Sequence, residues 1–265
     1  MRLLDGSDAS TCGFRVGAES WFGGYLGYCV TASPDEGADI GSAFDASEAI
    51  AVSRAVGEAV ERNVTLSVGR DRGWSPALAA RNGSLGAAFA VSAADARSRA
   101  RRELEERRTR ANVWSGRWRG VDATQDHPFS QAMGRAIGRR FFVLTCQEEP
   151  RWIAVLSDGP DGSCVFSDGY DERAGEAVAS ALREHLMFLS ARESPTFSVA
   201  KTEWDAAEAL ARLTSRPSGP GPLAVRSEPD VECFEHDLGF VALAMHDIDS
   251  SGADFANTVL GAFPW

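Results

Sequence analysis

Residues 84–108, SLGAAFAVSAADARSRARRELEERR, join a run of small apolar residues to a long charged segment with helical periodicity. The apolar part predicts a strand at 87–91 (AAFAV), and the charged part predicts a helix over about 94–113. A strand that leads directly into a long helix is typical of a fold that mixes the two kinds of element. This stretch therefore sets the expected fold class, which is α/β or α+β.

The same alternation continues on both sides of this stretch. Further helices are predicted at 46–63, 172–190 and 204–214, and further strands at 141–146 (FFVLTC), 152–157 (WIAVLS) and 239–245 (GFVALAM). No GxGxxG follows a strand and no GxxxxGK[ST] occurs, which argues against Rossmann and P-loop folds. We expect one domain over residues 1–265, with SRPSGPGP at 215–222 as a long loop.

Composition narrows the class of protein. The 265 residues are 44% hydrophobic and 25% charged, which is ordinary for a soluble domain. No apolar run is long enough to span a bilayer, and the N-terminus lacks the apolar centre of a signal peptide. The five cysteines form no CxxC pair, and their odd number argues against a disulfide framework. We expect a cytoplasmic protein with no membrane partner.

The net charge restricts the kinds of partner that the protein can bind. The formal net charge of −11 argues against nucleic acid as a partner. One segment is nevertheless rich in arginine: it runs from Arg97 to Arg119 and, with the preceding Ala96, reads ARSRARRELEERRTRANVWSGRWR. It is either a solvated helix face or a basic surface for ATP phosphates or an acidic peptide.

An internal repeat is the most informative feature of the sequence. In three of the predicted helices, alanines stand seven and three residues before a glutamate. The sets are Ala51, Ala55 and Glu58; Ala96, Ala100 and Glu103; and Ala177, Ala181 and Glu184. These positions share one helix face, so two small residues permit close packing and the glutamate extends the same stripe.

Two of these helices carry a second glutamate one turn later, Glu61 and Glu106, each followed by an arginine, Arg62 and Arg107. If the three helices converge, their carboxylates repel one another unless cations neutralise them. Magnesium with nucleotide phosphates is the natural partner of such oxygen ligands. The alternative is a set of salt bridges on solvated helix faces, which the same residues also form.

Three stretches resemble the signatures of the YcaO-like family: SRAVGEAVERN at 53–63, the stretch 84–108 quoted above, and FSDGYDERAGEAVASALREHLM at 166–187. In that family the first two motifs end in ExxER, and the third is a glycine-containing turn before a helix with Glu-x-x-Gln. The resemblance implies a YcaO-like domain, here in a shortened form, whose helices converge on a nucleotide cavity lined by carboxylates. It implies ATP and Mg²⁺ as cofactors.

Residue by residue, the resemblance implies magnesium ligands at Glu58, Glu61, Glu103, Glu106 and Glu184. It implies nucleotide contacts at Arg62, Ser84 and Arg107. It assigns no catalytic residue. Several positions depart from the signatures, and weaker nucleotide binding is expected because Leu85 and Met187 cannot donate side-chain hydrogen bonds. The departures are Arg54 for serine, Leu85 for asparagine, Ala90 for glycine, Arg108 for aspartate, Met187 for glutamine and Leu189 for arginine.

Two kinds of function remain open. The first is ATP-dependent activation of a peptide backbone amide, as a cyclodehydratase that forms azolines or as a thioamide-forming enzyme, in the maturation of a ribosomally made peptide natural product (RiPP biosynthesis). The second is a non-catalytic scaffold or regulatory subunit. The expected partners are a precursor peptide and an accessory protein or second YcaO-like subunit, with a homodimer also possible. His185 is expected to be structural or exposed, and Trp114 is expected to pack in the core, with a peptide groove as the alternative.

Overall fold

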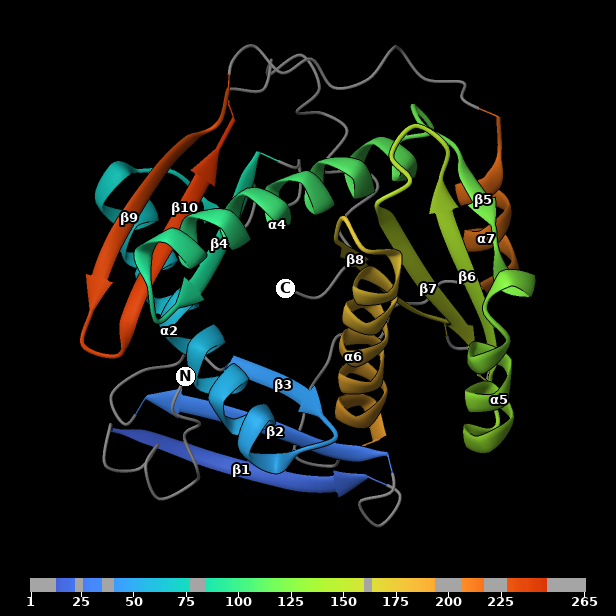
Figure 1. Ribbon diagram of the computed structural model, residues 1–265, viewed down its shortest axis with the longest axis horizontal. Coiled ribbons are helices and arrows are strands. Elements are labelled where there is room, and N and C mark those ends of the chain that lie inside the picture. Colours follow the sequence, from blue (N-terminus) through green and yellow to red (C-terminus); the bar gives the residue numbers. More distant parts are fainter. Residues whose placement is uncertain are drawn as a thin grey trace. The chain divides into compact units, whose positions relative to one another are not determined.

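The computed structural model describes residues 13–21, 26–34, 41–76, 84–159, 164–193, 206–216 and 228–246. Within these ranges, helices are mixed with antiparallel sheets, so the fold class is α+β, one of the two that the sequence predicts. Figure 1 shows the elements in chain order. In the described part of the chain, the helices fall short of the length and apolar character needed to cross a membrane.

The strands are β1 (Phe14–Trp21), β2 (Gly27–Pro34), β3 (Gly41–Asp45), β4 (Leu85–Ala90), β5 (Gly120–Asp122), β6 (Arg140–Cys146), β7 (Trp152–Asp158), β8 (Cys164–Tyr170), β9 (Asp230–His236) and β10 (Gly239–Met245). The helices are α2 (Glu48–Arg72), α4 (Ala93–Trp114), α5 (Pro128–Ile137), α6 (Ala174–Glu193), α7 (Ala206–Thr214) and the short 3-10 helix η2 (Thr124–Asp126). The chain divides into two compact units, which are described separately.

The first unit comprises Met1–Pro76, Leu85–Glu103 and Pro229–Met245. It holds two three-stranded antiparallel sheets, in the orders β1-β2-β3 and β4-β10-β9. Helix α2 packs on β2 and β3 and also contacts β4 and β10. It ends at Gly73, whose φ of 69° is the left-handed conformation that glycine adopts at a helix C-terminus without a Cβ penalty.

The second unit comprises Ala77–Ser84, Leu104–Glu228 and His246–Trp265. Its sheet is antiparallel, in the order β5-β6-β7-β8. On one face, Val143 and Ile153 pack against Ala177 and Val178 of α6. The other face is covered by the last turn of α4 and by α7, in a cluster that includes Trp114, Trp152, Phe166 and Leu213.

Strand β8 is buried along its whole length and alternates between these two faces. Phe166 and Tyr170 belong to the cluster under α4 and α7, so Asp168 between them projects to the same face. Ser167 and Gly169 project to the opposite face, toward α6. This alternation places an acidic side chain beside α4 and a glycine beside α6.

The structure differs from the sequence prediction in several elements. Helix α2 runs to Arg72, beyond the predicted end at residue 63. Strands β1, β2, β3, β5, β8 and β9 and helix α5 were not predicted. The expected glycine-containing turn at FSDGY is wrong, because these residues form β8, where a buried backbone obtains its hydrogen bonds from β7. Most of the predicted loop, 217–222, lies outside the described residues, and the single-domain arrangement stays a prediction.

Candidate metal centre

The repeated alanines are the most deeply packed helix residues. All six members of the stripe, Ala51, Ala55, Ala96, Ala100, Ala177 and Ala181, have exposed fractions of 0%. The prediction that these positions allow close packing is therefore confirmed. In each unit a strand glycine meets such a stripe, and a Cβ on it would overlap the helix backbone.

In the second unit this glycine is Gly169. A Cβ on Gly169 would lie 2.4 Å from the Ala177 carbonyl oxygen and 2.9 Å from the Ala181 nitrogen. Strand β8 and helix α6 therefore touch through their backbones. Glu184 stands one turn beyond Ala181 on the same helix face, so this close approach also sets the position of Glu184.

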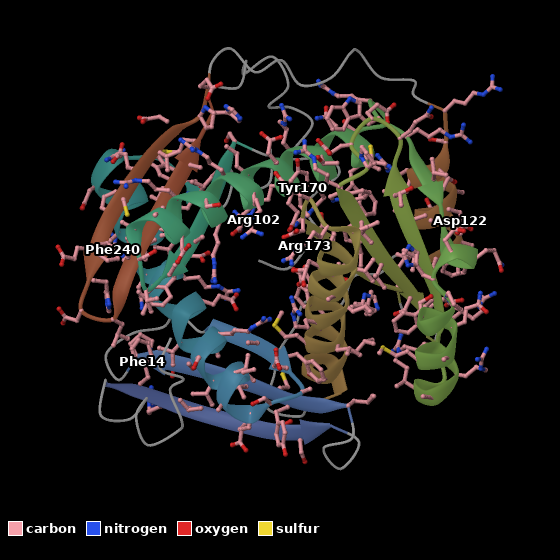
Figure 2. The ribbon with its side chains drawn as sticks, in the orientation of Figure 1. Phe14, Arg102, Asp122, Tyr170, Arg173 and Phe240 are labelled. Carbon is pink, nitrogen blue, oxygen red and sulfur yellow. The ribbon has the colours of Figure 1, made fainter. Side chains whose placement is uncertain are left out.

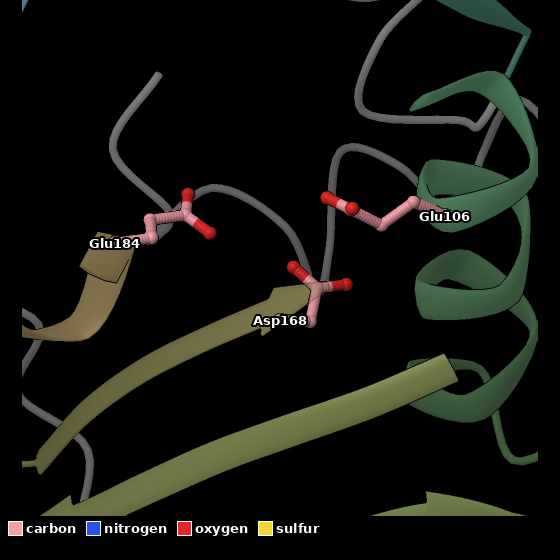
Figure 3. Close-up of side chains that lie close together, drawn as sticks. All are labelled: Glu106, Asp168 and Glu184. Carbon is pink, nitrogen blue, oxygen red and sulfur yellow. The ribbon is translucent and has the colours of Figure 1, made fainter. Parts of the chain in front are cut away.

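Three carboxylates from three different elements meet in the second unit. Glu106 of α4, Asp168 of β8 and Glu184 of α6 each offer a carboxylate oxygen, and these oxygens lie within 4.8 Å of one another. Figure 3 shows the three side chains pointing toward a common point. We call this set the carboxylate cluster. Two of its members, Glu106 and Glu184, are predicted metal ligands, whereas the sequence reasoning did not single out Asp168.

Asp168 is the buried centre of the carboxylate cluster, with a side chain that is 1% exposed. Its carboxylate accepts a hydrogen bond of 2.9 Å from Arg110 Nε and one of 2.7 Å from the indole Nε1 of Trp152. Arg110 also donates from Nη2 to Glu106 Oε1 at 3.2 Å. A buried carboxylate needs such partners, because an isolated charge is costly to remove from water.

The pKa of Arg110 reflects the negative charge of the carboxylates around it. Burial by itself lowers the pKa of the Arg110 guanidinium, but the negative charges of Asp168, Glu106 and Glu184 outweigh it and raise the pKa above its ordinary value. All three carboxylates therefore act on one cation.

This donor set fits a hard divalent cation. Magnesium prefers oxygen ligands and is commonly held by a small number of carboxylates together with phosphate oxygens. Arg110 would remain beside the ion, in a position typical of side chains that hold phosphate oxygens.

The other three predicted metal ligands, Glu58, Glu61 and Glu103, lie in the first unit, and we call them the first-unit glutamates. The Glu58 carboxylate is half-buried, forms an ion pair with Arg62 and accepts a 3.0 Å hydrogen bond from the Ser42 backbone N–H in β3. Burial raises the pKa of Glu58, and the charge of Glu103 adds to this, against the lowering effects of Arg62 and the Ser42 N–H.

Glu61 makes a similar contact with the second sheet of its unit. Its Oε2 accepts a 3.3 Å hydrogen bond from the Phe89 backbone N–H in β4. Glu58 and Glu61 thus connect α2 to one strand of each sheet. The predicted convergence of all five glutamates on one cavity involves residues of both units and stays a prediction.

The residues expected to contact nucleotide have the following places. Arg62 is engaged with Glu58 within α2. Arg107 is half-buried on α4. Ser84 is half-buried just before β4, and its carbonyl oxygen accepts a 3.0 Å hydrogen bond from the His246 backbone N–H. Their role in nucleotide binding stays a prediction.

Three of the six positions that depart from the family signatures are core residues. Leu85 is 1% exposed, Ala90 is 6% exposed and Leu189 is 0% exposed. Arg108 instead forms an ion pair with Glu105 on the same helix. The three apolar residues therefore contribute to packing, and their side chains have no polar atom to offer a ligand.

His185 has the structural role, one of the two alternatives that the sequence predicts. It is fully buried, with Nδ1 3.0 Å from Ser167 Oγ and Nε2 2.7 Å from Ser157 Oγ. Burial, assisted by the positive charge of Arg139, lowers its pKa from 6.5 to about 3. The neutral ring therefore connects α6 to β7 and β8. Trp114 is likewise a core residue, packed edge-on against Phe166.

A second set of charged side chains, Arg151 and Glu149, lies beside Tyr170 at the end of β8. The Arg151 guanidinium forms a two-pronged ion pair with Glu149, with distances of 2.7 and 2.8 Å, and lies over the ring of Tyr170, which Figure 2 labels. Burial, with the charge of Glu149, raises the pKa of the Tyr170 phenol. Arg151 and Glu149 pair one cation with one carboxylate, whereas three carboxylates meet in the carboxylate cluster.

Comparison of the sequence with protein-family models and with curated proteins gives no match. Among solved structures, the chain is similar to YcaO from Methanopyrus kandleri, determined with bound AMPPCP and Mg²⁺. The match has a TM-score of 0.49 and 16% sequence identity, and it covers 79% of this chain and 71% of that one. Because this likeness is modest, we base the functional proposals on the chain's own residues.

Proposed function

We propose that the chain binds a magnesium-nucleotide complex, with Glu106, Asp168 and Glu184 as the carboxylates that hold the metal. The observation that carries this proposal is the meeting of three carboxylates from α4, β8 and α6, whose oxygens lie within 4.8 Å of one another. A bound divalent cation would neutralise the negative charge that these three carboxylates bring to one point.

The reaction that we propose is ATP-dependent activation of a peptide backbone amide. A nucleophile adds to the carbonyl carbon, the resulting oxygen takes the terminal phosphoryl group of ATP, and phosphate then leaves. The product is an azoline or a thioamide, depending on the nucleophile. The three signature-like stretches support this reaction class, and magnesium would supply charge neutralisation for the phosphates. Arg110 would stay paired with Asp168 and orient that carboxylate.

A second candidate is a binding subunit that holds nucleotide or peptide without turnover. Leu85 favours it, because this residue stands where the family signature has asparagine and its side chain is buried in β4. Losing one hydrogen bond to a charged group costs on the order of 1.5–3 kcal/mol. Such a loss lowers nucleotide affinity and can leave binding without catalysis.

Two measurements on the full chain separate these possibilities. Calorimetry with AMPPCP, with and without Mg²⁺, tests binding, and phosphate release from ATP tests turnover. Magnesium-dependent binding together with phosphate release supports the enzyme. Binding without release, even with a precursor peptide and accessory protein present, supports the binding subunit. Absence of binding at millimolar Mg-nucleotide would overturn the proposal.

A further inference from the structure

The first half of α4 carries a concentration of positive charge that runs against the charge of the whole chain. Its residues 93–103 contain four arginines, Arg97, Arg99, Arg101 and Arg102, and all four are exposed. Against Asp95 and Glu103, the four arginines give this stretch a formal charge of plus two, whereas the chain as a whole carries −11. Figure 2 labels Arg102 on this helix.

Three of these arginines have side chains without a hydrogen-bonding or charged partner among the described residues. The side chains of Arg97, Arg99 and Arg101 make no hydrogen bond or ion pair with any residue that the structure describes. The arginines of the second half of α4 behave differently, since Arg108 pairs with Glu105 and Arg110 pairs with Asp168. The first half of the helix therefore presents unused guanidinium groups to solvent.

We propose that the face of α4 that carries Arg97 and Arg101, one helical turn apart with Arg102 at its edge, docks an acidic segment of the peptide substrate. The identity of this partner as a peptide rests on the proposed function. Guanidinium groups match carboxylates through two parallel hydrogen bonds, which a lysine cannot provide. Each such pair at an exposed surface is weak, so several carboxylates close together in one segment are needed to hold the peptide.

The size of the face favours a short acidic peptide over nucleic acid. Residues 97–102 span only about 7.5 Å along the helix axis. Proteins that bind duplex DNA through its backbone typically neutralise about 6–10 phosphates, which a face of this length does not reach.

Fluorescence anisotropy with a short fluorescein-labelled oligoglutamate peptide tests the inference on the full chain. We expect binding that weakens with added salt, and no binding of a labelled oligoglutamine peptide of equal length. The double variant R97E/R101E should raise Kd at least about tenfold, because two attractive contacts become repulsive. The control R70E/R135E changes two exposed arginines on α2 and α5 by the same charge and should leave Kd within about twofold.

Three results would overturn the inference: no binding of oligoglutamate, an equal loss in both double variants, or tighter binding of a single-stranded oligonucleotide of matched charge. Magnesium-dependent AMPPCP binding is measured on the same samples and should be unchanged in R97E/R101E. If the wild type binds oligoglutamate and not AMPPCP, the proposed function fails while the docking face stands. If it binds AMPPCP and not oligoglutamate, the reverse holds.

Discussion

The first-unit glutamates and the carboxylate cluster look alike in sequence but are held in different ways. Glu58 and Glu61 accept hydrogen bonds from backbone N–H groups of β3 and β4, and Arg62 of the same helix pairs with Glu58. In the carboxylate cluster, residues from α4, β8 and α6 meet, with Arg110 as the shared cation. The comparison teaches that a recurring ExxER motif serves two purposes here. One connects a helix to its sheets, and the other concentrates negative charge.

The largest expected effect comes from the buried centre of the carboxylate cluster. Asp168→Asn removes the charge that pairs with Arg110 and places an NH₂ group where only acceptors belong. Breaking a buried pair by removing one partner is strongly destabilising, and we expect a loss of about 3 kcal/mol in the free energy of unfolding. Urea denaturation of the two proteins at neutral pH measures it.

Asp158→Asn is the matched control. Asp158 pairs with Arg140, whose side chain is 75% exposed, and its loss should cost under about 1 kcal/mol. Equal losses in the two variants would show that Asp168 is no more than a surface ion-pair partner. The contrast between the two groups of carboxylates would then disappear.

The pH dependence of stability tests whether a buried, neutral His185 holds α6, the helix that carries Glu184, against its sheet. His185 has a folded pKa of about 3 against an ordinary value of 6.5. Its contribution is complete above the ordinary pKa and is lost as pH falls from there toward the folded value, at about 1.4 kcal/mol per pH unit. Between about pH 6.5 and about pH 4.5, the wild type should lose about 2–3 kcal/mol more than His185→Asn. Parallel curves for the two proteins would contradict the buried, neutral histidine.

The strand glycines test the close packing that both units share. Gly41→Ala would place a Cβ 1.9 Å from the Ala55 carbonyl oxygen, and Gly169→Ala would place one 2.4 Å from that of Ala177. We expect each substitution to cost about 1–3 kcal/mol, because the helix must move away from its sheet. Thermal unfolding measures both. Gly169→Ala should also weaken magnesium-nucleotide binding, whereas Gly41→Ala should affect it less.

Gly175→Ala is the control for these glycines. A Cβ at Gly175 has no atom within 4 Å, and the residue lies in the first turn of α6. Replacing a helical glycine by alanine stabilises by up to about 1 kcal/mol, so this variant should be as stable as the wild type or more so. A loss as large as that of Gly169→Ala would show that the close approach is not the cause.

The sequence predicted the elements that have strong periodicity. Helices α2, α4, α6 and α7 and strands β4, β6, β7 and β10 are visible as patterns, and the alanine stripe correctly identified buried helix faces. Strand β8 was missed because Ser167, Asp168 and Gly169 read as a turn in isolation. These residues form a strand because their backbone pairs with β7, and the local sequence of β8 does not show this pairing.

The same dependence on tertiary contacts explains why the sequence predicted only part of the carboxylate cluster. Glu106 and Glu184 were predicted from the repeat, but Asp168 lies outside it. Its signal was available in the alternation of CVFSDGY, where an acidic residue shares a face with Phe166 and Tyr170. An acidic residue on an apolar strand face needs a buried partner, and Arg110 is distant from it in sequence. Which cation would pair with it follows only from tertiary structure.

The most direct test of the central claim compares single glutamate-to-glutamine changes in the affinity for Mg-AMPPCP, measured by calorimetry on folded protein. Glu184→Gln should weaken binding at least about tenfold, because it removes one carboxylate from the metal. Glu176→Gln, an exposed position in the first turn of the same helix, should have no effect. Glu58→Gln should have a smaller effect than Glu184→Gln, because Arg62 and the Ser42 N–H already hold the Glu58 carboxylate. A large loss in Glu58→Gln with none in Glu184→Gln would contradict the assignment of the metal to the carboxylate cluster.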